Sequence, residues 1–100
     1  MTVQLRFQEG RLQLGGVVNF DNASDVCHQG LAHLRDAGSL VIVDLQGLQS
    51  GGSIDVAVLL QWVRAAARAN KQIRFDHVSA KLQAIIRVSG LNDVLLLVTP

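Results

Sequence analysis

The alternation of apolar and polar residues predicts how the chain begins. Val3-Gln4-Leu5-Arg6-Phe7-Gln8 and Arg11-Leu12-Gln13-Leu14 both have a period of two, which is typical of half-buried strands. Only Glu9-Gly10 separates them, so the pattern predicts an antiparallel hairpin with a tight turn. Gly15-Gly16 predicts a break or bulge in the second strand.

A helical period follows Phe20 and predicts a helix that ends near Ala37. Asn22, with Asp25 three residues later, is typical of an N-terminal cap, and Gly38 is typical of a helix end. A helix here should direct one apolar face toward the core. The residues of that face are Val26, Leu31 and Leu34, with Cys27 and Gly30 beside them.

Residues 40–70 form the stretch around which the rest of the chain is organised. Leu40–Val43 is apolar on both faces, which is typical of a strand buried on two sides. A polar turn with two glycines, 49–53, comes next. The pattern then predicts a helix from Ser53 to about Ala69.

Three further segments complete the predicted fold. Gln72–Asp76 alternates as a strand, Ala80–Val88 has a helical apolar face, and Val94–Val98 is a final strand or an apolar tail. The order is therefore β-β-α-β-α-β-α-β. Strands that alternate with helices indicate a single α/β domain over residues 1–100, with a mixed, mostly parallel sheet packed by helices.

The helix that starts at Ser53 has an unusually wide apolar surface. Its polar residues Gln61, Arg64 and Arg68 form one narrow stripe, and about three quarters of its circumference is apolar. We expect Leu59, Trp62, Val63 and Ala66 to face the sheet. The remaining apolar flanks are covered either by a partner chain or by helices and loops of this chain. Trp62 is expected near the edge of the core, as a core or an interface residue.

Ser53 is the strongest candidate for a functional residue. Its position predicts an N-cap, whose hydroxyl accepts a hydrogen bond from a backbone N–H of the first helical turn. The start of a helix also exposes unpaired N–H groups and a partial positive charge, which suit a phosphate, a carboxylate or an acceptor group of a partner. Capping alone and partner docking both remain open for Ser53.

Composition excludes several classes of protein. The net charge is +1 with 17% charged residues, which is not the basic balance of a nucleic-acid-binding protein. One cysteine provides neither a disulfide framework nor a zinc-ligand set. The chain starts without a signal-peptide pattern and has no apolar run of about 20 residues. We therefore expect a soluble cytoplasmic protein without direct membrane insertion.

Motifs for catalysis and cofactor binding are absent from the sequence. It has neither a Walker A nor a G-x-G-x-x-G motif. His28, His33 and His77 are interpreted as surface histidines, and Cys27 as a small core residue. Asp55 suits the first turn of its helix, and Asp44 suits a cap or an ion pair at a strand end. We expect no enzyme activity, no cofactor and no metal.

The arrangement around residues 43–64 resembles that of STAS domains. The resemblance rests on Val43-Asp44-Leu45 and on the run Gly52-Ser53-Ile54-Asp55-Val56-Ala57-Val58-Leu59-Leu60-Gln61-Trp62-Val63-Arg64. Residues 78–82 and 88–91 also resemble the C-terminal half of that family. The sequence is most similar to the small STAS subunits of Mla-type phospholipid-transport ABC transporters, and residues 61–64 are the most specific part.

The resemblance implies a binding subunit rather than an enzyme. Its partner would be the ATPase subunit of the ABC transporter, in a complex with a membrane permease that maintains outer-membrane lipid asymmetry in Gram-negative bacteria. The chain would then lie in the cytoplasm, peripheral to the inner membrane through its partner. The partner-binding residues are expected to be Ser53, Ile54, Ala57, Val58, Gln61 and Trp62.

Two other functions remain open at this point. The first is an anti-sigma-factor antagonist switched by phosphorylation of Ser53, the position that matches the phosphorylatable residue of the family. This sequence departs from the pattern there, because Gly52 replaces the aspartate of the family and Asp55 replaces a small residue. A carboxylate beside Ser53 would repel a phosphate. The second is a carrier of a lipid or small molecule, or an enzyme, with its ligand between helix and sheet.

Overall fold

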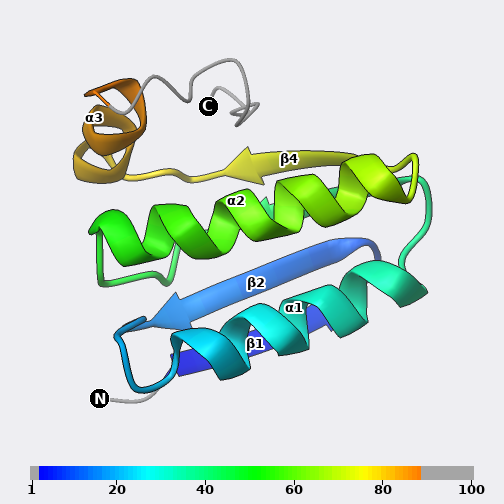
Figure 1. Ribbon diagram of the computed structural model, residues 1–100, viewed down its shortest axis with the longest axis horizontal. Helices are drawn as coiled ribbons and strands as arrows, with labels where there is room; N and C mark the ends of the chain where they lie inside the picture. The colour runs from blue at the N-terminus through cyan, green and yellow to red at the C-terminus, as the bar shows by residue number, and fades with distance from the viewer. Residues whose placement is uncertain (1–2, 89–100) are drawn as a thin grey trace.

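Four strands form one mixed sheet in the computed structural model, which describes residues 3–88 (Figure 1). The strands are β1 (Val3–Gln8), β2 (Arg11–Gly16), β3 (Leu40–Asp44) and β4 (Gln72–Asp76), in the spatial order β1-β2-β3-β4. β1 pairs with β2 in antiparallel orientation, whereas β2 with β3 and β3 with β4 are parallel. The predicted hairpin and the mixed, mostly parallel sheet are confirmed.

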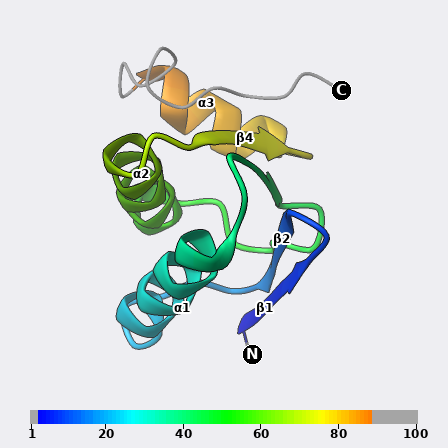
Figure 2. The ribbon, with the colours of Figure 1, turned by 90° about the vertical axis from the view of Figure 1, so that its right-hand side faces the viewer.

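Residues 3–88 also form three helices, of which two connect strands and the third follows β4. They are α1 (Ala23–Asp36), α2 (Ser53–Arg68) and α3 (Ala80–Val88), so the predicted order β-β-α-β-α-β-α is confirmed. The predicted segment Val94–Val98 lies outside the described residues. Figure 2 shows α1 and α2 side by side on one face of the sheet, with α3 beyond β4. α2 contacts both other helices and β4, so it is the central helix.

The core lies between the sheet and α1 and α2. Strand positions alternate, so every second side chain of β2, β3 and β4 is buried on the face that the helices cover. The largest fully buried side chains include Leu12, Leu14, Val41, Val43, Phe75, Val26, Leu59, Trp62, Leu82 and Ile86. The opposite face of the sheet is mostly polar and is not covered by α1 and α2. Leu40 lies on this face and is 45% exposed. The prediction that β3 is buried on both sides is therefore wrong at Leu40.

Gly15-Gly16 does not break β2, which corrects the sequence-based prediction. Both glycines pair with β1, and Gly16 N–H donates a hydrogen bond to the Gly47 carbonyl at 2.9 Å. A Cβ atom on Gly15 would lie 3.4 Å from the Gly47 oxygen. The absence of a side chain at Gly15 therefore lets the loop after β3 pack closely against the end of β2.

The wide apolar surface of α2 is covered to a large extent by this chain itself. Val58 is buried, and Trp62 is 0% exposed. The indole Nε1–H of Trp62 donates to the Cys27 carbonyl of α1 at 3.1 Å. Gly30 of α1 lies against the same indole ring. Neighbouring elements of the fold thus explain much of the apolar excess, and Trp62 belongs to the core.

The start of α1 differs from the prediction in how it is capped, whereas α2 ends where it was predicted to end. Asn22 occupies the N-cap position of α1, but its side chain makes no capping hydrogen bond. Its amide instead accepts from Asn19 N–H and donates to the Val17 carbonyl, both at 2.9 Å. At the far end of α2, Asn70 has a φ of 58°, and Lys71 N–H donates to the Ala66 carbonyl, as in a Schellman motif.

Candidate functional site

Three loops meet at one edge of the sheet. β2, β3 and β4 run parallel, so their C-terminal ends lie at the same edge (Figure 1). The loops that follow these strands are 17–22, 45–52 and 77–79. This edge is where open α/β sheets commonly bind ligands. It also holds the start of α2, and therefore Ser53.

The loop before α2 is organised by Asp55. The carboxylate is 1% exposed, and its Oδ2 accepts the Gly52 N–H at 2.7 Å. Its Oδ1 accepts the Ser50 hydroxyl at 2.8 Å, and Ser50 Oγ in turn accepts the Val18 N–H at 3.0 Å. One buried carboxylate thus connects the start of α2 with the loop after β2.

Ser53 is not the N-cap, which corrects the prediction made for it. Gly52 occupies the cap position, and Ser53 is the first residue of α2 and is exposed. The physical reason is that Asp55, at the third helical position, reaches back to the Gly52 N–H as in half of a capping box. The Ser53 side chain therefore lies at the surface rather than in the cap.

The six residues predicted to bind a partner divide into two groups. Ser53, Ala57 and Gln61 are exposed at intervals of four residues, and Ile54 beside them is half-buried. We call these four residues the α2 surface. Val58 and Trp62 are buried against neighbouring elements, so the structure contradicts the prediction that they bind a partner. The predicted set is thus one continuous stripe plus two core residues.

A cluster of charged side chains links the three parallel strands on the other side of the sheet. Arg11 of β2 donates to Asp44 of β3 at 3.2 Å and also to Asp76 of β4. His77 Nδ1 donates to Asp44 Oδ1 at 2.9 Å, and Gln46 N–H donates to the same oxygen at 3.0 Å. Asp44 therefore holds the bases of two of the three loops together.

The pKa values of both carboxyl groups in this cluster are lowered. Burial by itself raises the pKa of Asp44, but hydrogen bonds from Gln46, His77 and Arg11 together outweigh it. The pKa of Asp76 is lowered chiefly by its hydrogen bond from Arg11. Conversely, the two carboxylates raise the pKa of Arg11. Each hydrogen bond favours the charged form, so the cluster is an ion-pair network.

This network predicts that the protein becomes less stable in acid. The folded-state pKa of Asp44 lies below its ordinary value of 3.8, so its stabilisation is complete above that value and disappears as the pH falls through the folded-state pKa. Asp44→Asn should lower the melting temperature at pH 6, and the difference from the wild type should shrink at pH 3. Thermal unfolding followed by circular dichroism measures both values.

A control variant separates the cluster from a general effect of charge. Asp36→Asn removes an exposed carboxylate at the end of α1 and should leave the melting temperature nearly unchanged at both pH values. If the Asp44→Asn variant differed from the wild type by the same amount at pH 6 and pH 3, the Asp44 carboxylate would not contribute to the acid sensitivity.

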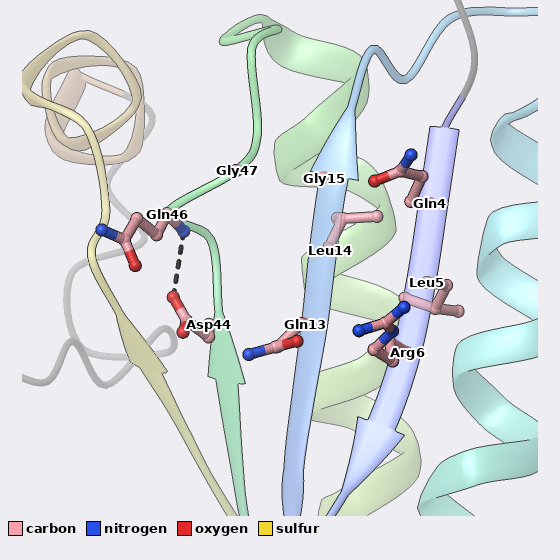
Figure 3. A pocket seen from close by; sticks show the side chains of 9 residues that line it. All are labelled: Gln4, Leu5, Arg6, Gln13, Leu14, Gly15, Asp44, Gln46 and Gly47. Atoms are coloured by element: carbon pink, nitrogen blue, oxygen red, sulfur yellow. Dashed lines mark hydrogen bonds between the residues drawn. The ribbon is translucent and has the colours of Figure 1, made fainter.

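A groove of about 680 Å³ lies beside the charged cluster (Figure 3). The residues that line it are Gln4, Leu5, Arg6, Gln13, Leu14, Gly15, Asp44, Gln46 and Gly47. It lies on the sheet face that α1 and α2 leave open, and most of its side chains are polar (Figure 3). This groove is not where a lipid carrier with its ligand between helix and sheet would bind that ligand. Such a carrier would need a cavity on the opposite face of the sheet, which α1 and α2 cover.

The part of the chain that the structure describes contains neither a metal-binding cluster nor a membrane-spanning helix. Within residues 3–88, no group of three or more His, Cys, Asp or Glu side chains is placed to hold a metal ion. Among these same residues, no helix combines the length and the apolar character that crossing a membrane requires.

Some residues of this edge were missed by the sequence analysis. The link from Ser50 to Asp55 joins residues five apart, and the Arg11–Asp76 pair joins residues 65 apart. Neither has a local sequence signal. No role was predicted for Phe20, whose side chain is 93% exposed. The turn-forming Asn19, Asp21 and Asn22 around it are the signal that could have indicated a surface position.

The fold and the family model reported below define the class of protein as a STAS domain. SpoIIAA, an anti-sigma-factor antagonist in its unphosphorylated form, superposes with a TM-score of 0.74 at 16% identity, over 98% of this chain and 89% of that one. An anti-sigma-factor antagonist from Mycobacterium paratuberculosis gives a TM-score of 0.74 at 15% identity, over 99% and 86% of the chains. At these identities the likeness concerns the fold.

The particular family follows from a closer match. The family model described as "Mlab, STAS domain" matches residues 1–99, and the chain belongs to that family. A chain of the Acinetobacter MlaFEDB complex in an ATP-bound conformation has 34% identity and a TM-score of 0.80, over 88% of this chain and 93% of that one. No curated protein matches this chain. The resemblance to STAS subunits of Mla-type transporters is confirmed.

Proposed function

We propose that this protein is a non-catalytic subunit that binds the ATPase of an Mla-type phospholipid-transport ABC transporter and supports its assembly and activity. The observation that carries the proposal is the family match over residues 1–99. The 34% identity with a chain of the Acinetobacter MlaFEDB complex supports it. The complex would include a membrane permease, and its role would be to maintain outer-membrane lipid asymmetry.

The α2 surface is proposed as the site that contacts the ATPase, an MlaF-like subunit. Ser53 and Ala57 are small, so a partner backbone can approach this part of α2 closely. Unpaired N–H groups in the first helical turn carry a partial positive charge, which suits a carbonyl or carboxylate of the partner. The protein would be held at the cytoplasmic face of the inner membrane through this contact.

Ser53→Glu is expected to abolish binding to the ATPase without unfolding the domain. A glutamate in the first helical turn interacts favourably with the helix dipole, so folding should be preserved or slightly improved. Within a close interface the same charge would be desolvated without a partner, at a cost of about 2–5 kcal/mol. Isothermal titration calorimetry with the purified ATPase subunit of the same organism measures the loss of affinity.

The matched control is Ser39→Glu. Ser39 is also exposed, but it precedes β3 and therefore lies at the opposite edge of the sheet. This variant should bind with wild-type affinity, and both variants should unfold at wild-type denaturant concentrations. Full retention of binding by Ser53→Glu would show that the α2 surface is not the contact site.

An anti-sigma-factor antagonist is the second candidate function, and the exposure of Ser53 is the observation that favours it. A kinase could reach this hydroxyl. The carboxylate of Asp55, two residues away in α2, is buried and hydrogen-bonded to Ser50 and Gly52. Incubation with ATP and the kinase of the same organism, followed by intact mass spectrometry, tests this function. An unchanged mass would count against it.

A further inference from the structure

Phe20 is the most exposed large apolar residue among the described residues, at 93%. It lies in the loop 17–22, between β2 and α1. An isolated exposed apolar residue is common on protein surfaces and needs no special explanation. Two additional observations distinguish Phe20: the loop that carries it is firmly held, and it lies at the same edge of the sheet as the α2 surface.

The loop around Phe20 is fixed by hydrogen bonds on both sides of the aromatic residue. The Asn19 side chain accepts from Asp21 N–H at 2.9 Å and from Asn22 N–H at 3.0 Å. The Asn22 side chain accepts from Asn19 N–H and donates to Val17 O. A loop organised before binding loses little conformational entropy when its side chain is buried by a partner. The loop therefore holds Phe20 in an exposed position before a partner binds.

The loop that carries Phe20 contacts the loop that leads to Ser53. Val18 N–H donates to Ser50 Oγ at 3.0 Å, and these residues are two and three positions from Phe20 and Ser53. In Figure 1 both loops lie at the end where α1 and α2 begin.

The α2 surface lacks a large apolar side chain of its own. Its exposed members are a serine, an alanine and a glutamine, and Ile54 is half-buried. Stable interfaces usually depend on a few large anchors, with aromatic residues enriched, which enter apolar pockets of the partner. An interface built on this edge of the sheet would therefore take its anchor from a neighbouring element.

We propose that Phe20 is this anchor and that it inserts into an apolar pocket of the same ATPase subunit that binds the α2 surface. This inference rests on the proposed function, and it extends the binding site from α2 to the loop between β2 and α1. The kind of partner it specifies is a protein surface with a hydrophobic pocket next to a groove that accepts the start of a helix.

The test compares three variants in titrations against the purified ATPase subunit. Phe20→Ala should raise the dissociation constant about 30-fold or more, the size expected for a hot-spot residue. Phe20→Leu, which keeps an apolar side chain, should recover most of the affinity. Leu40→Ala is the control, because Leu40 is 45% exposed and lies at the start of β3, at the opposite edge. It should bind like the wild type.

The outcomes separate this inference from the proposed function. If Ser53→Glu abolishes binding while Phe20→Ala binds within twofold of the wild type, the anchor role is wrong and the proposed function stands. If the wild-type protein does not bind the ATPase, both are wrong. Because the Phe20 side chain is almost fully exposed, its truncation should leave the urea midpoint of unfolding unchanged. A weakened affinity with an unchanged midpoint supports the inference.

Discussion

Gly30→Ala is expected to lower the free energy of unfolding by about 2 kcal/mol or more, a large fraction of the stability of a small domain. The new Cβ atom would lie 2.2 Å from Cε2 of Trp62. The indole ring is fully buried and bonded through Nε1 to the Cys27 carbonyl, so it cannot move without losing contacts. Urea denaturation measures the effect.

Helix propensity alone predicts the opposite result. Replacing glycine with alanine inside a helix increases the free energy of unfolding by about 1 kcal/mol. The clash with Trp62 should outweigh this gain, because overpacking a rigid core typically costs about 1–3 kcal/mol and a ring held on all sides is at the upper end. A Gly30→Ala variant as stable as the wild type would show that α1 and α2 can separate at little cost.

Gly38→Ala provides the matched control. A Cβ atom on Gly38 would meet no heavy atom within 4 Å. The substitution should therefore change the free energy of unfolding by no more than about 0.5 kcal/mol. The comparison isolates the contact between α1 and Trp62 from the general effect of removing a glycine.

Asp55→Ala is expected to destabilise the protein by about 2–3 kcal/mol and also to weaken binding to the ATPase. The substitution removes the acceptor of two hydrogen bonds, from Ser50 and from the Gly52 N–H, in a buried setting. Hydrogen bonds to a charged group contribute about 1.5–3 kcal/mol each, and part of this loss is recovered by water that enters the loop. Chemical denaturation and calorimetric titration measure the two effects.

The loss of binding would arise from the loop rather than from a direct contact. Asp55 is buried, so it cannot touch a partner, but it sets the position of the residues before Ser53. Asp25 in the first turn of α1 is exposed, and Asp25→Ala removes only an interaction with the helix dipole. That control should cost at most about 1 kcal/mol. Equal effects of the two substitutions would contradict the organising role of Asp55.

The order of the helices and strands could be read from local patterns. A period of two identified β1 and β2, and a helical period identified α1 and α2, because the side-chain direction repeats along a single element. The exposed stripe of α2 at Ser53, Ala57 and Gln61 could be predicted for the same reason. The family relationship was also contained in the sequence, in the run around Ser53.

The assignments that failed were those that depend on neighbouring elements. Periodicity showed that Val58 and Trp62 are apolar, but it did not show that both are buried within this chain or that α1 packs against Trp62. In the same way, Ser53 resembled an N-cap until the buried Asp55 carboxylate was seen to bond to Gly52 instead. Both outcomes depend on which residues are neighbours in the folded chain. The spacing of residues in the sequence does not contain that information.

The sequence by itself thus determined the fold class, the family and the helix that presents Ser53. Only the tertiary structure decided which apolar residues are core, how Asp55 holds the loop and that Phe20 lies at the same edge as the α2 surface. The reason is physical. Local periodicity records the direction of a side chain relative to its own element, whereas burial and hydrogen bonding depend on residues that are distant in the chain.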